Sequence, residues 1–276
     1  MIPLRDNIPP RTFPFVNYLL IAICGIVFFA QTADTTDGED LLVEKFAMIP
    51  QRVLHPDQPV TLREEVIVND FGGPRRELIE RTLPPLPFSP WLTLFTCTFL
   101  HGGWMHFLGN MWFLHIFGDN VEDRFGHFGY LLLYLGCGIA ASAAHLALNA
   151  SSTMPTIGAS GAIAGVMGAY LFVYPRATVL TLVPIVFFIQ MMVIPAWVFL
   201  IFWFGLQFFQ GAFAITSHEA GGVAWWAHVG GFAAGFATAW LLERSNHLRP
   251  PVDVVLPNTQ RPTMYRYRRP PSGYWE

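Results

Sequence analysis

Charged residues are scarce in this sequence. Only 13% of its 276 residues are Asp, Glu, Lys or Arg, and 53% are hydrophobic, whereas a soluble domain usually has about 25% charged residues. Four segments have no charged residue at all: 82–118, 125–175, 177–218 and 220–242. An apolar run of about 18 residues is already long enough to cross a bilayer as a helix. The composition therefore excludes a soluble globular domain and predicts a polytopic membrane protein.

Cysteine is also rare, and no metal-ligand pattern stands in its place. The three cysteines are far apart and odd in number, so the sequence contains neither a disulfide framework nor a C-x-x-C pair. His101, His106 and His115 are close in the chain, but there is no H-E-x-x-H motif and no carboxylate on their helical face. We expect no metal and no cofactor.

The hydrophobic pattern predicts six membrane-spanning helices. The first, at about 15–31, follows two arginines as a signal peptide would, but no A-x-A cleavage pattern comes after it, so we expect a retained span. Pro184 and Pro195 interrupt the later apolar region, so we expect 179–195 to be a partly interfacial connection. The other five expected spans are 104–118, 128–149, 160–174, 196–214 and 224–242.

The distribution of arginine predicts the topology. The tail 244–276 has six arginines and two acidic residues, and the arm 1–14 has two arginines and one acidic residue. Because arginine next to a span tends to stay in the cytoplasm, we expect both ends to be cytoplasmic and the polar insert 32–90 to lie outside. The membrane domain is then 15–243, in what we expect to be a bacterial plasma membrane. The Pro- and Arg-rich tail is expected to be disordered and to contact anionic lipids rather than nucleic acid.

The insert 32–90 is longer than a connection between two spans requires. Within it, EEVIVND followed by FGGP predicts a strand and a turn, and 41–48 has the pattern of an amphipathic interfacial segment. Two roles stay open for the insert. We favour a structural cap over the first loop, and the alternative is recruitment of a substrate.

Small residues follow one face of each of two expected spans. Gly161 and Gly165 share a face of the fourth span, and Gly231 and Gly235 share a face of the last. Because glycines four residues apart let helices approach closely in lipid, we expect these two helices to pack on each other. Taken alone, such faces are ordinary packing motifs.

Reactive side chains lie beside these faces. Ser160 begins the fourth span, and His228 lies on the small face of the last. An ionisable residue inside a span is by default a functional candidate, and a hydroxyl beside an imidazole is the minimal nucleophile and base pair. His228 must be neutral to accept the serine proton, so activity is expected to fall on acidification.

A second pair of polar residues shares a face of the second expected span. His106 and Asn110 are four residues apart, whereas His115 is half a turn out of phase with them and points elsewhere. Two N–H donors on one face suit the stabilisation of an oxyanion. The alternative is a hydrogen bond between helices without any chemistry.

Taken together, these motifs resemble the rhomboid family of intramembrane serine proteases. The resemblance covers about 91–242 and depends on four motifs: His106-x-x-x-Asn110, Glu122-x-Arg124, Gly158-Ala159-Ser160-Gly161 and Ala227-His228-x-x-Gly231. It implies that Ser160 is the nucleophile and His228 the general base, in a dyad without an acidic third member. It also implies an oxyanion hole made by the Ser160 backbone N–H, His106 and Asn110.

The resemblance also implies structural roles. Glu122 and Arg124 would tie the cytoplasmic turn after the second span, and His101 would be a structural histidine of the first loop. Two positions depart from the family pattern. The aromatic residue often found four after the serine, which stacks on the histidine, is Ala164 here, and a Trp-Arg pair of the first loop is Trp91-Leu92. Neither change removes a reacting group.

The expected function is that of an intramembrane serine endopeptidase that cleaves transmembrane segments of other membrane proteins. Glycine or proline in the substrate span, with a small residue before the cut, would ease the local unwinding that cleavage requires. The alternative is an inactive rhomboid-like protein that binds membrane clients, and the presence of both Ser160 and His228 argues against it. A transporter would need intramembrane carboxylates or inverted repeats, which the spans lack. The oligomeric state is not encoded in any feature we identify.

Overall fold

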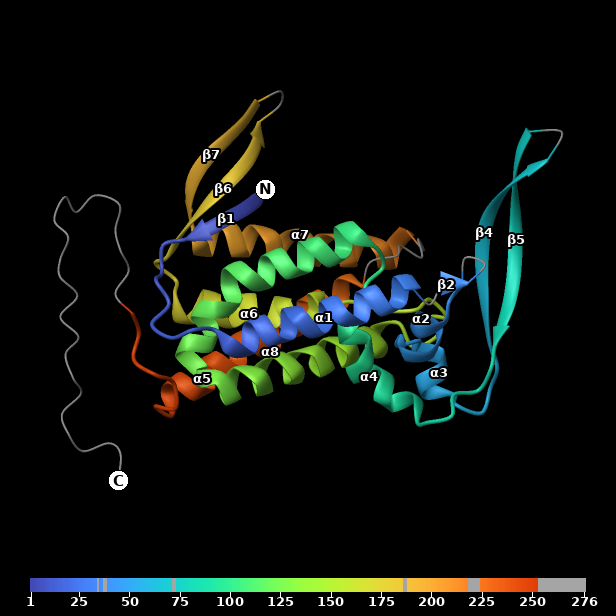
Figure 1. The fold of residues 1–276 in the computed structure, drawn as a ribbon, viewed down its shortest axis with the longest axis horizontal. Helices are drawn as coiled ribbons and strands as arrows, with labels where there is room; N and C mark the ends of the chain where they lie inside the picture. The colour runs from blue at the N-terminus through green and yellow to red at the C-terminus, as the bar shows by residue number, and fades with distance from the viewer. Residues whose placement is uncertain (34, 37–38, 71–72, 186–187, 218–223, 253–276) are drawn as a thin grey trace.

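The helices of this protein form one bundle, which Figure 1 shows with its long axis horizontal. The computed structural model describes residues 1–33, 35–36, 39–70, 73–185, 188–217 and 224–252. The long helices are α1 (Phe15–Ala33), α5 (Trp104–Leu148), α6 (Ser160–Val173), α7 (Ala196–Ser217) and α8 (Trp225–Arg244). The short helical segments are α2 (Leu41–Phe46), α3 (Pro50–Leu54), η1 (Pro90–Leu92), α4 (Thr93–Thr96) and η2 (Cys97–Phe99). The strands are β1 (Ile2–Asp6), β2 (Thr35–Thr36), β3 (Glu39–Asp40), β4 (Val60–Asp70), β5 (Gly73–Leu83), β6 (Thr178–Ile185) and β7 (Phe188–Pro195).

Helix α5 consists of two passes through the bundle that meet at Gly126. This residue has φ 72° and ψ 162°, which is not a helical conformation, and glycine adopts it without a steric penalty. In Figure 1 the two halves run in opposite directions. They correspond to the separate spans expected at 104–118 and 128–149.

By length and composition, two described helices could cross a membrane. These are α1 and α5, while α6 and the segment Ala196–Gln210 of α7 are apolar but shorter. Helix α6 has 14 residues, which corresponds to about 21 Å at 1.5 Å per residue, against a hydrocarbon core of about 30 Å. The count of six spans stays a prediction.

The all-α expectation omitted small antiparallel sheets that accompany the helices. In the described residues, β6 pairs with β1 on one side and with β7 on the other. The hairpin of β6 and β7 forms the connection at 179–195, which we expected to be partly interfacial but assigned no strands. Pro184 and Pro195 exclude a helix there, but they lie towards the ends of the strands. β-branched residues such as Val179 and Thr181 favour the strand itself.

The described part of the insert contains the predicted strand, whereas the turn expected at FGGP begins at 71–72, outside the described residues. β4 and β5 form a hairpin in which Val60 pairs with Leu83 and Asp70 with Gly73. Figure 1 shows this hairpin extending away from the bundle, on the far side from β6 and β7. Helices α2 and α3 lie at its base, next to the bundle.

Backbone hydrogen bonds attach the base of the insert to the loop that precedes α6. Met48 and Thr156 exchange two such bonds of 3.1 and 2.8 Å, and the Gln51 N–H donates to the Ser152 carbonyl at 3.0 Å. The Thr96 hydroxyl donates to the Phe46 carbonyl at 2.8 Å. These bonds anchor the first loop, although Trp91-Leu92 replaces the Trp-Arg pair of the family pattern. This arrangement fits a structural cap better than a detached recruitment module.

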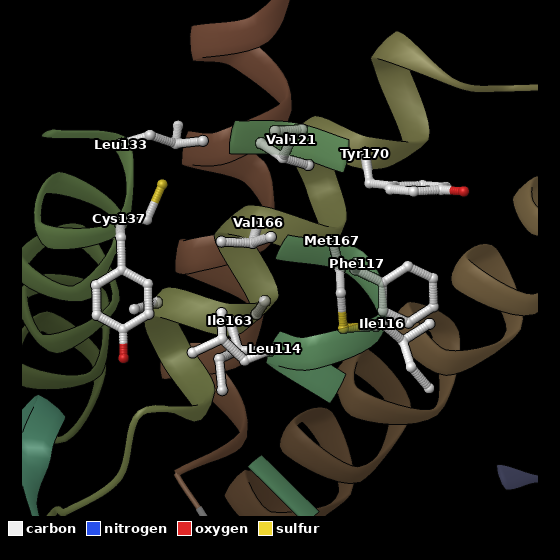
Figure 2. Close-up of a cluster of buried hydrophobic side chains, with 14 of the residues drawn as sticks. Leu114, Ile116, Phe117, Val121, Leu133, Cys137, Ile163, Val166, Met167 and Tyr170 are labelled. Atoms are coloured by element: carbon white, nitrogen blue, oxygen red, sulfur yellow. The ribbon is translucent and has the colours of Figure 1, made fainter. Parts of the chain in front are cut away.

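Helix α6 lies in the middle of the core. Its residues from Gly161 to Tyr170 are all buried. Figure 2 shows side chains of α6 such as Ile163 and Met167 among those of α5 such as Leu114 and Phe117. A central helix with so little exposed surface is held by contacts on all sides.

The glycine faces of α6 and α8 touch backbone to backbone. A methyl group added to Gly235 would overlap the Gly165 carbonyl oxygen, and one added to Gly231 would overlap that of Gly161. A methyl group on Gly168 would likewise overlap the Phe232 carbonyl oxygen. The two helices are therefore as close as glycine permits.

We predict that Gly235→Ala lowers the stability of the folded protein by about 1–3 kcal/mol, the usual effect of overpacking a filled contact. Gly136→Ala in α5 is the matched control, because a methyl group there meets nothing within 4 Å and alanine favours a helix over glycine. Thermal unfolding in detergent micelles measures both variants. Equal melting temperatures for the two would contradict the backbone contact.

Charged residues join the ends of three helices at the end of the bundle where α1 begins. The Glu122 carboxylate accepts hydrogen bonds from the N–H groups of Val16 (2.9 Å) and Asn17 (2.7 Å) and so caps α1. The Arg124 guanidinium pairs with Glu243 of α8 at 2.6 Å. These contacts fit the structural roles expected for Glu122 and Arg124.

The N-terminal arm and the first residues of the tail pack at this same end. Arg11 of the N-terminal arm pairs with Asp123 at 2.6 Å, and the Arg249 N–H donates to the Arg124 carbonyl at 2.9 Å. The first residues of the tail 244–276, up to Arg249, are therefore docked on the bundle. The disorder expected for the rest of the tail concerns 253–276, which lies outside the described residues.

A buried carboxylate attaches β1 to the core. Asp6 accepts hydrogen bonds from the hydroxyl of Tyr170 at 2.5 Å, from the side chain of Asn120 at 2.7 Å and from the N–H of Ile8 at 3.2 Å. Burial outweighs these bonds and raises the pKa of Asp6 from 3.8 to about 6. The carboxylate of Asp119 lies near enough to interact with it.

The Asp6 pKa predicts how its contribution to stability depends on pH. Because the pKa is higher in the folded state, the folded protein binds more protons between pH 3.8 and about 6, and the contribution of Asp6 falls as pH rises through this window. Asp6→Asn keeps an acceptor but cannot ionise. Its melting temperature relative to the wild type should therefore increase from pH 4.5 to 7.5. A difference that stays constant with pH would contradict the buried carboxylate.

Candidate active site

The side chains of Ser160 and His228 meet where α6 and α8 begin. His228 Nε2 lies 2.7 Å from Ser160 Oγ, although the two residues are 68 positions apart in the chain. His228 is buried, with 8% of its surface exposed. The contact between Gly161 and Gly231 lies one residue from Ser160 and three from His228. The packing of the two glycine faces therefore fixes how the two side chains meet.

The pair opens into a cavity of about 450 Å³. Its lining is mostly apolar; apart from the serine, the polar side chains are His106, Asn110, Gln207 and His228, and Trp203 adds an indole N–H. A cavity with apolar walls and a few convergent polar groups is typical of a binding or catalytic site.

Gly158 brings the loop before α6 against His106. Its φ of 129° lies in the region that favours glycine, and a Cβ there would come within 2.8 Å of the imidazole ring. The Gly158 N–H donates to the Cys97 carbonyl at 2.9 Å. Any larger residue at this position would displace the His106 ring.

His106 presents one ring nitrogen to the cavity as a donor. Its Nδ1 accepts a hydrogen bond from the Gly102 N–H at 3.2 Å. In a neutral imidazole, one nitrogen accepts and the other carries the proton. Nε2 of His106 is then an N–H donor on the side facing Gly158 and Ser160.

Asn110 offers a second donor, which has no partner. Its side chain is 8% exposed, and within the described part of the chain no group accepts a hydrogen bond from Nδ2. A buried donor left unsatisfied costs about 1–3 kcal/mol. The cost is recovered if a ligand brings an acceptor into the cavity.

A smaller cavity of about 20 Å³ lies behind the serine. It is lined by Ser160, Gly161 and Gly158 together with residues of η2, α5 and α8. This volume holds about one water molecule or a group of similar size. Gly161 also packs against Ala141 of α5.

The sequence reasoning missed the residues that hold the His228 ring. Helix α7 contributes Gln207, whose Oε1 lies 2.6 Å from His228 Nδ1, and Trp203, whose ring centroid lies 5.8 Å from that of His228. Trp225 adds an edge contact at 6.2 Å. The aromatic support expected at Ala164 thus comes from α7 and α8. A signal was present, because Gln207 is a polar residue within an apolar run, four positions after Trp203.

The other two histidines singled out from the sequence lie outside the Ser160 and His228 pair. His101 is buried, and its backbone exchanges two hydrogen bonds with the Gln31 side chain at 3.0 and 3.2 Å, which joins the end of α1 to the first loop. Its ring lies edge-on to that of His106, with centroids 5.5 Å apart. His115 is exposed and lies beside Tyr18. Across the described residues, no group of three or more His, Cys, Asp or Glu side chains is placed to hold a metal ion.

Comparison with known proteins is consistent with this geometry. The family model described as a rhomboid domain matches residues 89–245, more than half of the chain. RHOMBOID-like protein 5 of Arabidopsis thaliana is 30% identical over 182 residues, which is 61% of this chain and 55% of the relative. Rhomboid protease GluP of Bacillus subtilis is 37% identical over 103 residues, 37% of this chain and 18% of the relative. Rhomboid-like protein 11, chloroplastic, of Arabidopsis thaliana is 39% identical over 89 residues, 31% of this chain and 30% of the relative. The matches thus span about half or less of the relatives' own length.

Proposed function

The chain belongs to the rhomboid family of integral membrane proteins, and on that premise we propose that it is an intramembrane serine endopeptidase. Its substrates would be transmembrane segments of other membrane proteins. The observation that supports this most strongly is the 2.7 Å approach of His228 Nε2 to Ser160 Oγ, in a cavity that also contains the unpartnered Asn110 donor.

In the proposed mechanism, His228 acts first as a base and then as an acid. Ser160 Oγ bonds to the scissile carbonyl carbon as its proton moves to His228 Nε2, and the carbonyl π electrons move to the oxygen. The oxyanion then re-forms the carbonyl, the C–N bond breaks, and the proton passes to the leaving amine. Water hydrolyses the acyl-enzyme by the same steps, with His228 accepting the proton of the water.

Three donors would stabilise the oxyanion of the tetrahedral intermediate. They are the backbone N–H of Ser160, Nε2–H of His106 and Nδ2 of Asn110. Ser160 begins α6, so its N–H has no partner within the helix and lies at the positive end of the helix dipole. Preorganised donors of this kind provide one of the largest contributions to catalysis.

We propose that six helices span the membrane: α1, the two halves of α5, α6, α7 and α8. Both termini would be cytoplasmic, with an arm at 1–14, a membrane domain at 15–243 and a tail at 244–276. The docking of Arg11 and Arg249 at the same end of the bundle supports this arrangement. Tyr170, near the other end of α6 from Ser160, bonds to Asp6 of the arm. The active site would then open on the extracytoplasmic side.

The surface and the small cavity indicate the surroundings and the substrate. Large apolar side chains are exposed on α1 and α7, including Ile26 at 70% and Phe209 at 72%, and lipid would cover them. The cavity of about 20 Å³ beside Ser160 would accept a small side chain, such as alanine, before the scissile bond. The relatives include bacterial, chloroplastic and mitochondrial proteins. They do not single out one membrane, and a bacterial plasma membrane stays our expectation.

Cleavage in liposomes tests the proposal. The purified protein is reconstituted with a designed single-span substrate that has glycine in its span and alanine before the intended cut. We expect cleavage at that position, and a much lower rate when tryptophan replaces the alanine. Absence of cleavage, with retained binding of the substrate, would favour an inactive rhomboid-like protein that binds membrane clients.

A further inference from the structure

Gln207 contacts the imidazole of His228 on the side opposite Ser160. Its Oε1 lies 2.6 Å from Nδ1, while Ser160 Oγ lies 2.7 Å from Nε2. Both Gln207 and His228 are 8% exposed. The three side chains come from α7, α8 and α6, and they form one hydrogen-bonded chain through the ring.

The tautomer of His228 depends on what Nδ1 meets. A neutral imidazole carries one proton. With the Gln207 amide oxygen against Nδ1, the proton is on Nδ1 and the lone pair of Nε2 faces the Ser160 hydroxyl. The opposite tautomer would place N–H against the serine and could not accept its proton.

We propose that Gln207 is a positioning residue of the active site, which holds His228 in the tautomer and orientation that accept the Ser160 proton. This inference rests on the proposed function. Gln207 takes no proton, because its amide oxygen accepts the Nδ1–H bond both before and after His228 is protonated at Nε2. A neutral amide here takes the position that a carboxylate occupies in a Ser-His-Asp triad.

Helix α7 supports this role over a full turn. Trp203 lies four residues before Gln207 and therefore on the same face, and its ring is tilted by 38° to that of His228. Within residues 201–210, Gln207 is the buried position, and the others are partly or fully exposed. The helix thus directs one polar side chain inwards, to the atom of His228 that needs an acceptor.

The other titratable groups near His228 do not provide this acceptor. His106 and His145, both of α5, act on it electrostatically, and neither has a carboxylate that could accept a hydrogen bond from Nδ1. Within the described part of the chain, the hydrogen-bond partners of the ring are Ser160 and Gln207. The acceptor at Nδ1 therefore comes from Gln207.

Three variants of the full-length protein in detergent micelles test the proposal. Gln207→Leu removes the acceptor, Gln207→Glu replaces it with a carboxylate of the same shape, and Gln210→Leu is the control, the same change on the same helix at an exposed position. The measurements are the rate of labelling by a fluorophosphonate probe from pH 5 to 9, and kcat and KM for a cleaved substrate.

We expect Gln207→Leu to lower kcat and the labelling rate by about 10- to 100-fold, the effect of losing one hydrogen bond to a group that becomes charged. KM should change by less than about threefold, because the hydrogen bond to Nδ1 strengthens only when His228 becomes charged in the transition state. Gln207→Glu should retain activity above pH 8 and move the acid limb of the profile up by about one pH unit, since a carboxylate stabilises the imidazolium. Gln210→Leu should match the wild type.

Two results would overturn the proposal. One is a Gln207→Leu variant with wild-type kcat and pH profile. The other is a Gln207→Glu profile that superimposes on that of the wild type, and this variant alone decides the matter if Gln207→Leu does not fold. A wild-type protein that neither labels nor cleaves would instead overturn the proposed function.

Discussion

The Ser160→Ala variant is expected to lose cleavage of a transmembrane substrate by at least about 10⁴-fold, since removing the nucleophile leaves only binding and oxyanion stabilisation. Its fold should persist. The hydroxyl contributes one hydrogen bond, to His228, and α6 is held by the buried backbone contacts of its glycines. The assay is cleavage in liposomes, with thermal unfolding as the check on folding.

Ser151→Ala is the matched control for this loss. Ser151 is an exposed residue of the loop before α6, so the same atom is removed outside the site. Its activity should equal that of the wild type. If Ser160→Ala cleaved at more than about a tenth of the wild-type rate, another nucleophile would have to be at work.

The Asn110→Ala variant is expected to remain folded but to cleave about 10²–10³-fold more slowly, the usual effect of losing one oxyanion donor. The loss should fall on kcat and leave KM nearly unchanged, because the donor meets negative charge only in the transition state. Stability should not fall, since Nδ2 has no partner to lose in the described structure.

Asn110→Asp separates this role from packing. Aspartate has nearly the shape of asparagine, but its ionised carboxylate accepts hydrogen bonds and cannot donate. It should be at least as slow as the alanine variant in steady-state cleavage. An Asn110→Ala variant with wild-type kcat would show that Asn110 only packs between helices, the alternative that the sequence left open.

Local spacing predicted much of the candidate site, because a helix repeats every 3.6 residues. The interval from His106 to Asn110 places both on one face, and the glycine intervals of α6 and α8 predicted faces that do touch. The start of α5 at Trp104 also matches the start of the span expected at 104–118. Each of these depends only on residues within one helix.

What the sequence could not provide is the part that α7 plays in the site. Gln207 was visible as a polar residue in an apolar run, but nothing within α7 shows that it faces His228 rather than lipid. The absence of an aromatic at Ala164 likewise gave no indication that Trp203 supports the ring from another helix. Contacts between distant segments are set by tertiary packing, which one sequence does not encode in any local pattern.

The main error in the predicted fold is the omission of strands between α6 and α7. Pro184 and Pro195 correctly excluded a helix between α6 and α7, but exclusion of a helix does not specify what replaces it. The strand β6 forms because β1 of the N-terminal arm and β7 both pair with it. The pairing with β1 joins residues more than 170 positions apart, beyond the range of any propensity.

The central claim is that Ser160 is a nucleophile activated by His228. Its most direct measurement is the mass spectrum of the purified protein after reaction with a fluorophosphonate probe, with the adduct located by peptide mapping. Serine attack on phosphorus forms an Oγ–P bond and releases fluoride, so the account predicts a single adduct on Ser160 in the wild type, none in Ser160→Ala, and a greatly slowed reaction in His228→Ala. An unlabelled wild type, or an adduct on another residue that persists in Ser160→Ala, would contradict it.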